Sequence, residues 1–210
     1  MGYTSIGPTT LLSPLPVVMV SCCDGDGRNN IVTAAWCGIV NTHPPMLSVS
    51  LKPSRLSHDW IRERGAFVVS LVDRSMAEDC DFCGVRSGRD TDKFRARALT
   101  PLPLSALPEV PGIQGSPVCL PCRVHSIQPL GSHDLILGNI LDVCVRDDLF
   151  DGDGSLHLER AGLVAYNHGV YQCLGDVIGF FGYSVARKDV RRKRMQRYAK
   201  PGGASGHRQA

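Results

Sequence analysis

Two short stretches of this sequence concentrate residue types that could do chemistry. The stretch CGVRSGRDTDKF, residues 83–94, combines a thiol, two glycines, two arginines, a lysine and two aspartates. The stretch SVSLKPSRLS, residues 48–57, brings two cations and several hydroxyls together after an apolar run. Three alternatives compete for residues 83–94: half of a four-cysteine metal site, a cation loop built on aspartates, or a donor-rich cradle for an anionic cofactor.

The metal alternative depends on two CxxC pairs, Cys80–Cys83 and Cys119–Cys122. Paired CxxC motifs commonly hold zinc through four thiolates. The second pair, however, lies inside a strand-like run with a proline between its cysteines, and neither pair is followed by a Gly-rich turn. The nine cysteines are scattered among strand-like segments. We therefore expect reduced thiols, buried or partly buried, and no metal ligands.

The stretch 48–57 favours an anion site. Lys52 and Arg55 precede Ser57, which we expect as the N-cap of a helix over residues 57–64, stopped by Gly65. Cations, hydroxyls and free backbone N–H groups at one helix N-terminus attract phosphate. The alternative is a capped helix with solvated basic residues nearby.

The stretch 83–94 supplies further anion donors from Ser87, Arg89 and Lys93, and its glycines allow close backbone approach to a ligand. The alternative is a surface cluster in which Asp90 and Asp92 pair with the neighbouring cations.

The elements that must position these residues are mostly strands. Apolar or alternating runs over 15–23, 30–40, 46–51 and 66–72 are separated by Gly, Pro and Asn. Two longer runs flank a Gly-Ser turn at residues 131–132 and predict a hairpin. Many short strands with few crossover helices favour an antiparallel barrel.

Composition limits the class of protein. With 210 residues and 43% hydrophobic content, the chain can bury the core of one domain. No window has the length of a membrane span, and the first residues do not form a signal peptide, so we expect a cytoplasmic protein without a membrane partner. Residues 186–200 carry eight Lys or Arg, but Tyr198 is the one aromatic among them and no nucleic-acid motif is present. We therefore expect no nucleic-acid partner.

The order of motifs along the chain points to a family. NNIVTAAW, HPPMLSVSLKPSRLSHDWIRERGAFVVSLV, CGVRSGRDTDKF, HDLILGNI and YQCLG follow one another. This order resembles the flavin reductase-like, FMN-binding split-barrel family, and within it the flavoredoxin group, over roughly residues 10–185. The resemblance implies a mainly β protein: a six-stranded antiparallel split β-barrel with a few flanking helices over residues 1–185. A basic C-terminal helix and tail over 186–210 would follow, and a homodimer would hold FMN near the subunit interface.

The resemblance also implies which residues contact FMN. One group lies beside the isoalloxazine ring and ribityl chain, a second at the ribityl and phosphate end, and a third makes further contacts. The first group is Asn30, Thr33, Ala34, Ala35 and Trp36; the second is Ser50, Arg55 and Ser57; the third is Ser87, Lys93, His133 and Tyr166.

A bound flavin carries the hydride and electron chemistry itself, so we assign no catalytic residue of the chain. No GxGxxG motif follows a strand, and we expect no separate dinucleotide domain. The resemblance implies that NAD(P)H stacks on the flavin directly. The first hypothesis is an NAD(P)H-dependent FMN reductase. The second is a flavoredoxin-like electron-transfer flavoprotein with a ferredoxin-like or other redox partner, which the basic residues 186–200 slightly favour.

Overall fold

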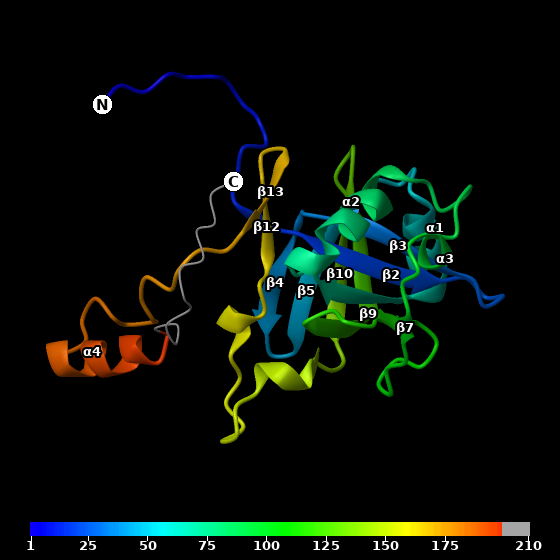
Figure 1. Cartoon of the computed structure of the whole chain (residues 1–210). Helices are drawn as coiled ribbons and strands as arrows, with labels where there is room; N and C mark the ends of the chain where they lie inside the picture. The colour runs from blue at the N-terminus through cyan, green and yellow to red at the C-terminus, as the bar shows by residue number, and fades with distance from the viewer. Residues whose placement is uncertain (199–210) are drawn as a thin grey trace, which may run out of the picture. The chain divides into compact units, whose positions relative to one another are not determined.

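A computed structural model describes residues 1–198 of the chain (Figure 1). Contacts divide it into two compact units, Met1–Leu174 and a second that begins at Gly175. The first unit holds the strands and helices α1 to α3, and the second holds the basic helix α4 (Lys188–Gln196). The expected domain boundary after residue 185 stays a prediction. Of the predicted basic C-terminal helix and tail over residues 186–210, residues 199–210 lie outside the described residues.

The main sheet is antiparallel, with strand order β3-β2-β6-β9-β10-β5-β4, and a short strand β11 pairs with β9. The strands β3 and β5 also contact each other, which curves the sheet toward closure. The mainly β split-barrel prediction is confirmed. The strands are β2 (Val18–Cys23), β3 (Asn29–Ala34), β4 (Cys37–Thr42), β5 (Pro45–Leu51), β6 (Ala66–Leu71), β9 (Val118–Pro129), β10 (Asp134–Ile140) and β11 (Cys144–Val145).

The main sheet has eight strands and not the six expected from the sequence. The predicted strand over 30–40 is interrupted at Ala35 and Trp36, which separates β3 from β4. The interruption is a tight turn, in which the Cys37 N–H donates to the Ala35 carbonyl at 3.1 Å. The Trp36 carbonyl instead accepts a hydrogen bond from the Ser50 N–H at 2.8 Å, which anchors the turn to β5. The two-residue β11 is the other additional strand.

Two smaller sheets flank the main one. The first consists of β1 (Leu15–Pro16), β12 (Val164–Asn167) and β13 (Val170–Cys173). The β12–β13 hairpin turns through His168 and Gly169, both at positive φ. The second sheet pairs β7 (Pro101–Leu102) with β8 (Gly112–Ile113).

The central strands are buried on both faces. Val18, Val20 and Cys22 of β2 face the barrel core together with Phe67, whereas Met19 faces a second core under α2 and α3. A third core lies near β8 and β9. Because β2 and β3 are covered on both sides, they give the polar residues on β3 a rigid backbone.

Helix α1 (Leu56–Arg64) lies beside β2, and α2 (Ala77–Val85) lies beside β3 (Figure 1). The predicted N-cap was wrong: Arg55 is the N-cap residue of α1, and Ser57 lies in the first turn. The reason is that the buried Ser57 hydroxyl accepts a hydrogen bond from Asn30 of β3. The predicted stop is confirmed, because Gly65 ends α1 in the left-handed conformation at φ 64°.

The sequence did not predict α2 or α3 (Lys93–Ala96). Asp92 is the N-cap of α3, and its carboxylate accepts a hydrogen bond from the Arg95 N–H at 3.1 Å. Asp92 therefore positions the loop before α3 by capping this helix. Three single-turn 3₁₀ helices complete the described structure: η1 (Arg74–Met76), η2 (Asp147–Leu149) and η3 (Leu158–Arg160). Within residues 1–198, no helix is long and apolar enough to cross a membrane.

The close approach of β10 to the barrel core predicts the effect of one substitution. A Cβ added at Gly138 would lie 2.6 Å from Cζ of the buried Phe67. We expect Gly138→Ala to lower the free energy of unfolding by about 1–3 kcal/mol, as overpacking does, in chemical denaturation. Gly152→Ala is the control, because the space at Gly152 is open. Equal stability of the two variants would contradict this packing.

Candidate functional site

Two adjoining cavities lie where β3, the start of α1 and the loop after α2 meet. Val32, Lys52 and Arg55 line both, so the cavities form the two ends of one site. We call the first, of about 250 Å³, the cationic cavity, and the second, of about 280 Å³, the aromatic cavity. The cationic cavity is lined by Asn30, Val32, Lys52, Ser54, Arg55, Leu56, Ser57, Arg86, Ser87, Gly88 and Lys93. The aromatic cavity is lined by Val17, Val32, Thr33, Ala34, Ala35, Trp36, Ser50, Leu51, Lys52, Arg55, Gly84, His133, Tyr166 and Tyr171.

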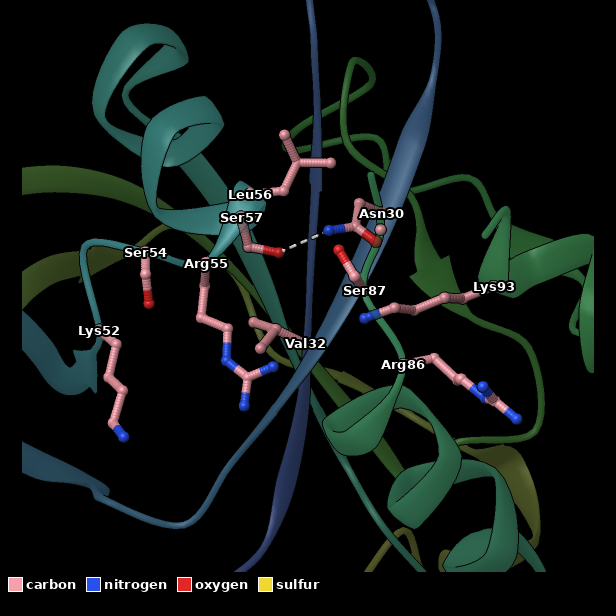
Figure 2. A pocket seen from close by; sticks show the side chains of 11 residues that line it. Asn30, Val32, Lys52, Ser54, Arg55, Leu56, Ser57, Arg86, Ser87 and Lys93 are labelled. Carbon is pink, nitrogen blue, oxygen red and sulfur yellow. Dashed lines mark hydrogen bonds between the residues drawn. The ribbon is translucent and has the colours of Figure 1, made fainter. Parts of the chain in front are cut away.

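The cationic cavity has no acidic residue among the described residues that line it. Figure 2 shows Arg55 and Lys93 reaching toward the same space from opposite sides. Neither these two cations nor Lys52 forms an ion pair with any carboxylate in residues 1–198. Positive charge without an internal partner favours an anionic ligand, and the serine hydroxyls in the wall add hydrogen-bond donors.

The start of α1 adds backbone donors to the cationic cavity. The N–H groups of Leu56 and Ser57 have no hydrogen-bond partner in the described chain, and Arg55 provides no side-chain cap. Unpaired N–H groups at a helix N-terminus attract anions because of the helix dipole. The donor set of this cavity therefore fits a phosphate group.

Lys93 is held at the base of the cavity with only 2% of its surface exposed. Its Nζ donates to the Ile31 carbonyl of β3 at 2.6 Å and to the Cys83 carbonyl of α2 at 2.8 Å. Burial lowers the pKa of this ammonium group, and the positive charge of Arg55 lowers it further. An anion bound beside Lys93 would act in the opposite direction and favour the charged form.

Asn30 connects three elements at the same place. It is 3% exposed, and its side-chain amide donates to the Ser57 hydroxyl at 2.9 Å (Figure 2). The loop after α2 packs directly onto that amide, because any Cβ at Gly88 would overlap Asn30 Oδ1. Gly88 is therefore required for this close approach of the loop to β3.

The aromatic cavity has a different character. The Trp36 and His133 rings contact each other with centroids 4.6 Å apart, and Tyr166 makes an edge contact with Tyr171 at 5.6 Å. Burial, followed by the charge of Lys52, lowers the pKa of His133, which favours the neutral imidazole. Planar side chains around a cavity of this kind fit a planar ring system.

Two hydrogen bonds fix the side of the aromatic cavity that faces α2. The Thr33 hydroxyl donates to the Cys80 carbonyl, and the Tyr171 hydroxyl donates to the Asp81 carboxylate at 3.0 Å. Burial raises the pKa of Tyr171, so the phenol stays protonated and keeps donating. The β12–β13 hairpin is thereby fastened to α2 beside the cavity.

The structure brings together all twelve residues that the sequence assigned to cofactor contacts. The two cavities divide them between the cationic and aromatic ends, and Arg55 belongs to both. Their individual contacts with FMN stay predictions. The cationic cavity contains Asn30, Arg55, Ser57, Ser87 and Lys93, and the aromatic cavity contains Thr33, Ala34, Ala35, Trp36, Ser50, Arg55, His133 and Tyr166.

One expected donor lies elsewhere. Arg89 does not line either cavity, and its guanidinium instead pairs with Asp59 of α1 at 3.1 Å. Sequence reasoning also left Arg86, Gly84 and Tyr171 unassigned, although all three line the site. Tyr171 was open to prediction, since a hairpin turn at Asn-His-Gly places it opposite Tyr166.

The four cysteines of the CxxC pairs belong to three different cores, which argues against a shared metal ion. Cys80 and Cys83 of α2 pack in the second core, Cys119 of β9 packs in the third core, and Cys122 faces the barrel core. Burial raises the pKa of Cys80 to about 12 and that of Cys83 to about 11, so both stay protonated. In the described part of the chain, no group of three His, Cys, Asp or Glu is arranged to hold a metal ion.

These features define a split-barrel protein whose site joins an anion-binding end to an aromatic end. The model of the family described as "Flavin reductase like domain" matches residues 11–174, so the chain belongs to the flavin reductase-like family. It is also 25% identical to a flavin reductase from Pseudomonas putida over 151 residues, which is 71% of this chain and 81% of that protein.

Solved structures of several proteins, including the following two, are similar to this chain. Flavoredoxin of Desulfovibrio vulgaris (Miyazaki F) has 29% sequence identity and a TM-score of 0.82, with 88% of this chain and all (100%) of that chain covered. An FMN-binding protein from Thermus thermophilus has 24% identity and a TM-score of 0.69, with 82% and 95% covered, and supports the fold alone. The family and the flavoredoxin support flavin binding and a redox function for this chain.

The cationic cavity predicts the effect of removing one charge. We expect Arg55→Gln to weaken FMN binding roughly 10- to 150-fold, the equivalent of about 1.5–3 kcal/mol for one charge-assisted hydrogen bond, in a flavin fluorescence titration. Arg89→Gln is the control, because Arg89 lies in the neighbouring loop and pairs with Asp59. Equal affinities of the two variants for FMN would show that Arg55 does not hold the phosphate.

Proposed function

We propose that the chain binds FMN across the two cavities and acts as an NAD(P)H-dependent oxidoreductase of the flavin reductase type. The observation that carries the proposal is that the cationic cavity and the aromatic cavity adjoin. Cations without a carboxylate partner and free α1 N–H groups meet at one end, and aromatic side chains line the other. FMN has the matching chemistry, an anionic phosphate joined by a polar chain to a planar ring.

The residues of the chain would divide the work of holding FMN. Arg55, Ser57 and the α1 N–H groups hold the phosphate, while Lys93 fixes the backbone of β3 next to it. Trp36 and the preceding alanines line the ring end, where a partly apolar wall excludes water. When bound, the flavin supplies the two-electron chemistry, so no acid, base or nucleophile of the chain is required.

NAD(P)H is the proposed electron donor, and the cytoplasm is the proposed location. A second candidate function is electron transfer with a protein partner, as in flavoredoxin, and two observations favour it. The similarity to flavoredoxin extends over the whole of that chain. Helix α4 is also strongly basic and has no buried residue, which suits an acidic partner such as a ferredoxin-like protein.

Absorption spectroscopy tests the cofactor, and anaerobic stopped-flow reduction separates the two functions. We expect the desalted protein to retain FMN with two flavin absorption bands, and we expect NADH or NADPH to bleach them rapidly. Bleaching by a reduced ferredoxin, but not by NAD(P)H, would favour the electron carrier. A protein that takes up no FMN would contradict both functions.

We also propose that the chain forms a homodimer through the edge strand β4. This strand pairs only with β5 within the described chain and is exposed along most of its length. Ile39 is 66% exposed and Val40 51% exposed, three and four residues after Trp36 of the aromatic cavity. An open edge with apolar side chains is a favourable surface for pairing with a second copy.

A charge on this edge tests the dimer. We expect Ile39→Lys to shift the chain from dimer to monomer in sedimentation equilibrium, because a buried lysine without a partner is costly at an interface. Val143→Lys is the control, because Val143 is similarly exposed (53%) and lies outside β4. A dimer that survives Ile39→Lys, or a monomeric wild type, would contradict this interface.

A further inference from the structure

A third cavity, of about 410 Å³, lies outside the proposed FMN site. We call it the N-terminal cavity, because residues 10–13 and Leu15 form one wall of it. Trp36 and Tyr166 line both this cavity and the aromatic cavity. The turn of the β12–β13 hairpin, at His168 and Gly169, forms the remaining wall.

The walls of this cavity are fastened to each other. Strand β1 pairs with β12, with Leu15 opposite Tyr166. Beyond this pair, the Ser13 hydroxyl donates to the Asn167 side chain at 2.6 Å. The Asn167 side chain in turn donates to the Gln172 side chain at 2.7 Å. The N-terminal segment is thus held against the hairpin, and the cavity between them is part of the fold.

The lining indicates the class of ligand. No Lys, Arg, Asp or Glu is among the residues that line the N-terminal cavity, in contrast to the cationic cavity. Leucines and the two shared aromatic rings supply apolar and planar contacts. The Thr10 hydroxyl and the His168 imidazole have no hydrogen-bond partner in residues 1–198 and are available to a ligand. A phosphate or carboxylate has no cationic partner here, whereas a neutral ring with a polar substituent does have suitable contacts.

We propose that the N-terminal cavity is a second ligand site, which binds a neutral, planar organic molecule against Trp36. This inference goes beyond the proposed flavin chemistry and does not require it. Because Trp36 and Tyr166 line both cavities, occupation of one changes the environment of the other. Any effect of a bound neutral aromatic compound on FMN affinity would, by linkage, be matched by an equal effect of FMN on the affinity for that compound.

NMR of the tryptophan indole groups tests the site, because the chain has two tryptophans and only Trp36 lines the cavity. The probe is 4-hydroxyacetophenone at about pH 6.5, where it is neutral, with 4-hydroxybenzoate as its anionic analogue. We expect the neutral probe to shift the Trp36 signal saturably and to leave the signal of Trp60 in the barrel core unchanged. We expect the anion to bind at least about tenfold more weakly.

Two variants locate the bound probe. We expect Leu11→Glu to lower the affinity for the neutral probe about tenfold. Val143→Glu is the control, because Val143 is 53% exposed and Leu11 is 46% exposed, and it should leave the affinity for the probe unchanged. His168→Asn removes the imidazole, and asparagine is tolerated in the left-handed conformation of this turn, at φ 47°. We expect this variant to lower the affinity for the neutral probe severalfold.

The outcomes separate this inference from the proposed FMN function. FMN uptake is measured in parallel, and Leu11→Glu should retain it because Leu11 lines neither FMN cavity. Equal binding of the neutral and anionic probes, no shift of the Trp36 signal, or full probe affinity in Leu11→Glu would overturn the inference, whether or not FMN binds. Loss of FMN binding alone would count only against the proposed function.

Discussion

The ammonium group of Lys93 is the contact on which the rest of the site depends. A buried charge needs polar partners, and this one finds them in the carbonyls of Ile31 and Cys83, at 2.6 and 2.8 Å. These two bonds join β3 to the end of α2. The loop that follows α2 then packs its Gly88 onto Asn30, and Asn30 reaches Ser57 at the start of α1. One buried lysine thereby brings a strand and two helices to a single cavity.

The electrostatic consequence is a cavity that has cations and no internal counter-ion. Lys52, Arg55 and Lys93 have no carboxylate partner in the described chain, although ion pairs are formed nearby, as between Arg89 and Asp59. Mutual repulsion among such cations costs stability unless a ligand neutralises them. Arg89 is thus neutralised by a carboxylate, whereas the cations of the cavity have no carboxylate partner and can attract an anion. The aromatic cavity beside them gives the ligand its second, planar part.

Much of this arrangement could be predicted from the sequence, and the failures have physical causes. The mainly β fold and the β9–β10 hairpin follow from local alternation and turn residues. The family resemblance singled out twelve residues that line the two cavities, and their contacts with FMN stay predictions. Ser57 was misplaced because an N-cap serine and a first-turn serine look alike in sequence, and only the buried contact with Asn30 distinguishes them. Helix α2 was missed because its polar and apolar residues lack a clear helical period. Arg89 was misassigned because its partner, Asp59, is remote along the chain.

The central claim is that unpartnered cations hold the phosphate of FMN, and the salt dependence of binding to the wild-type chain tests it most directly. FMN and riboflavin differ only in that phosphate, so each is titrated against the protein at low and high NaCl concentration. The account predicts one FMN per chain, with an affinity that falls as salt screens the cations, while riboflavin binds more weakly and responds little to salt. FMN and riboflavin affinities that are equal, or equally insensitive to salt, would contradict it.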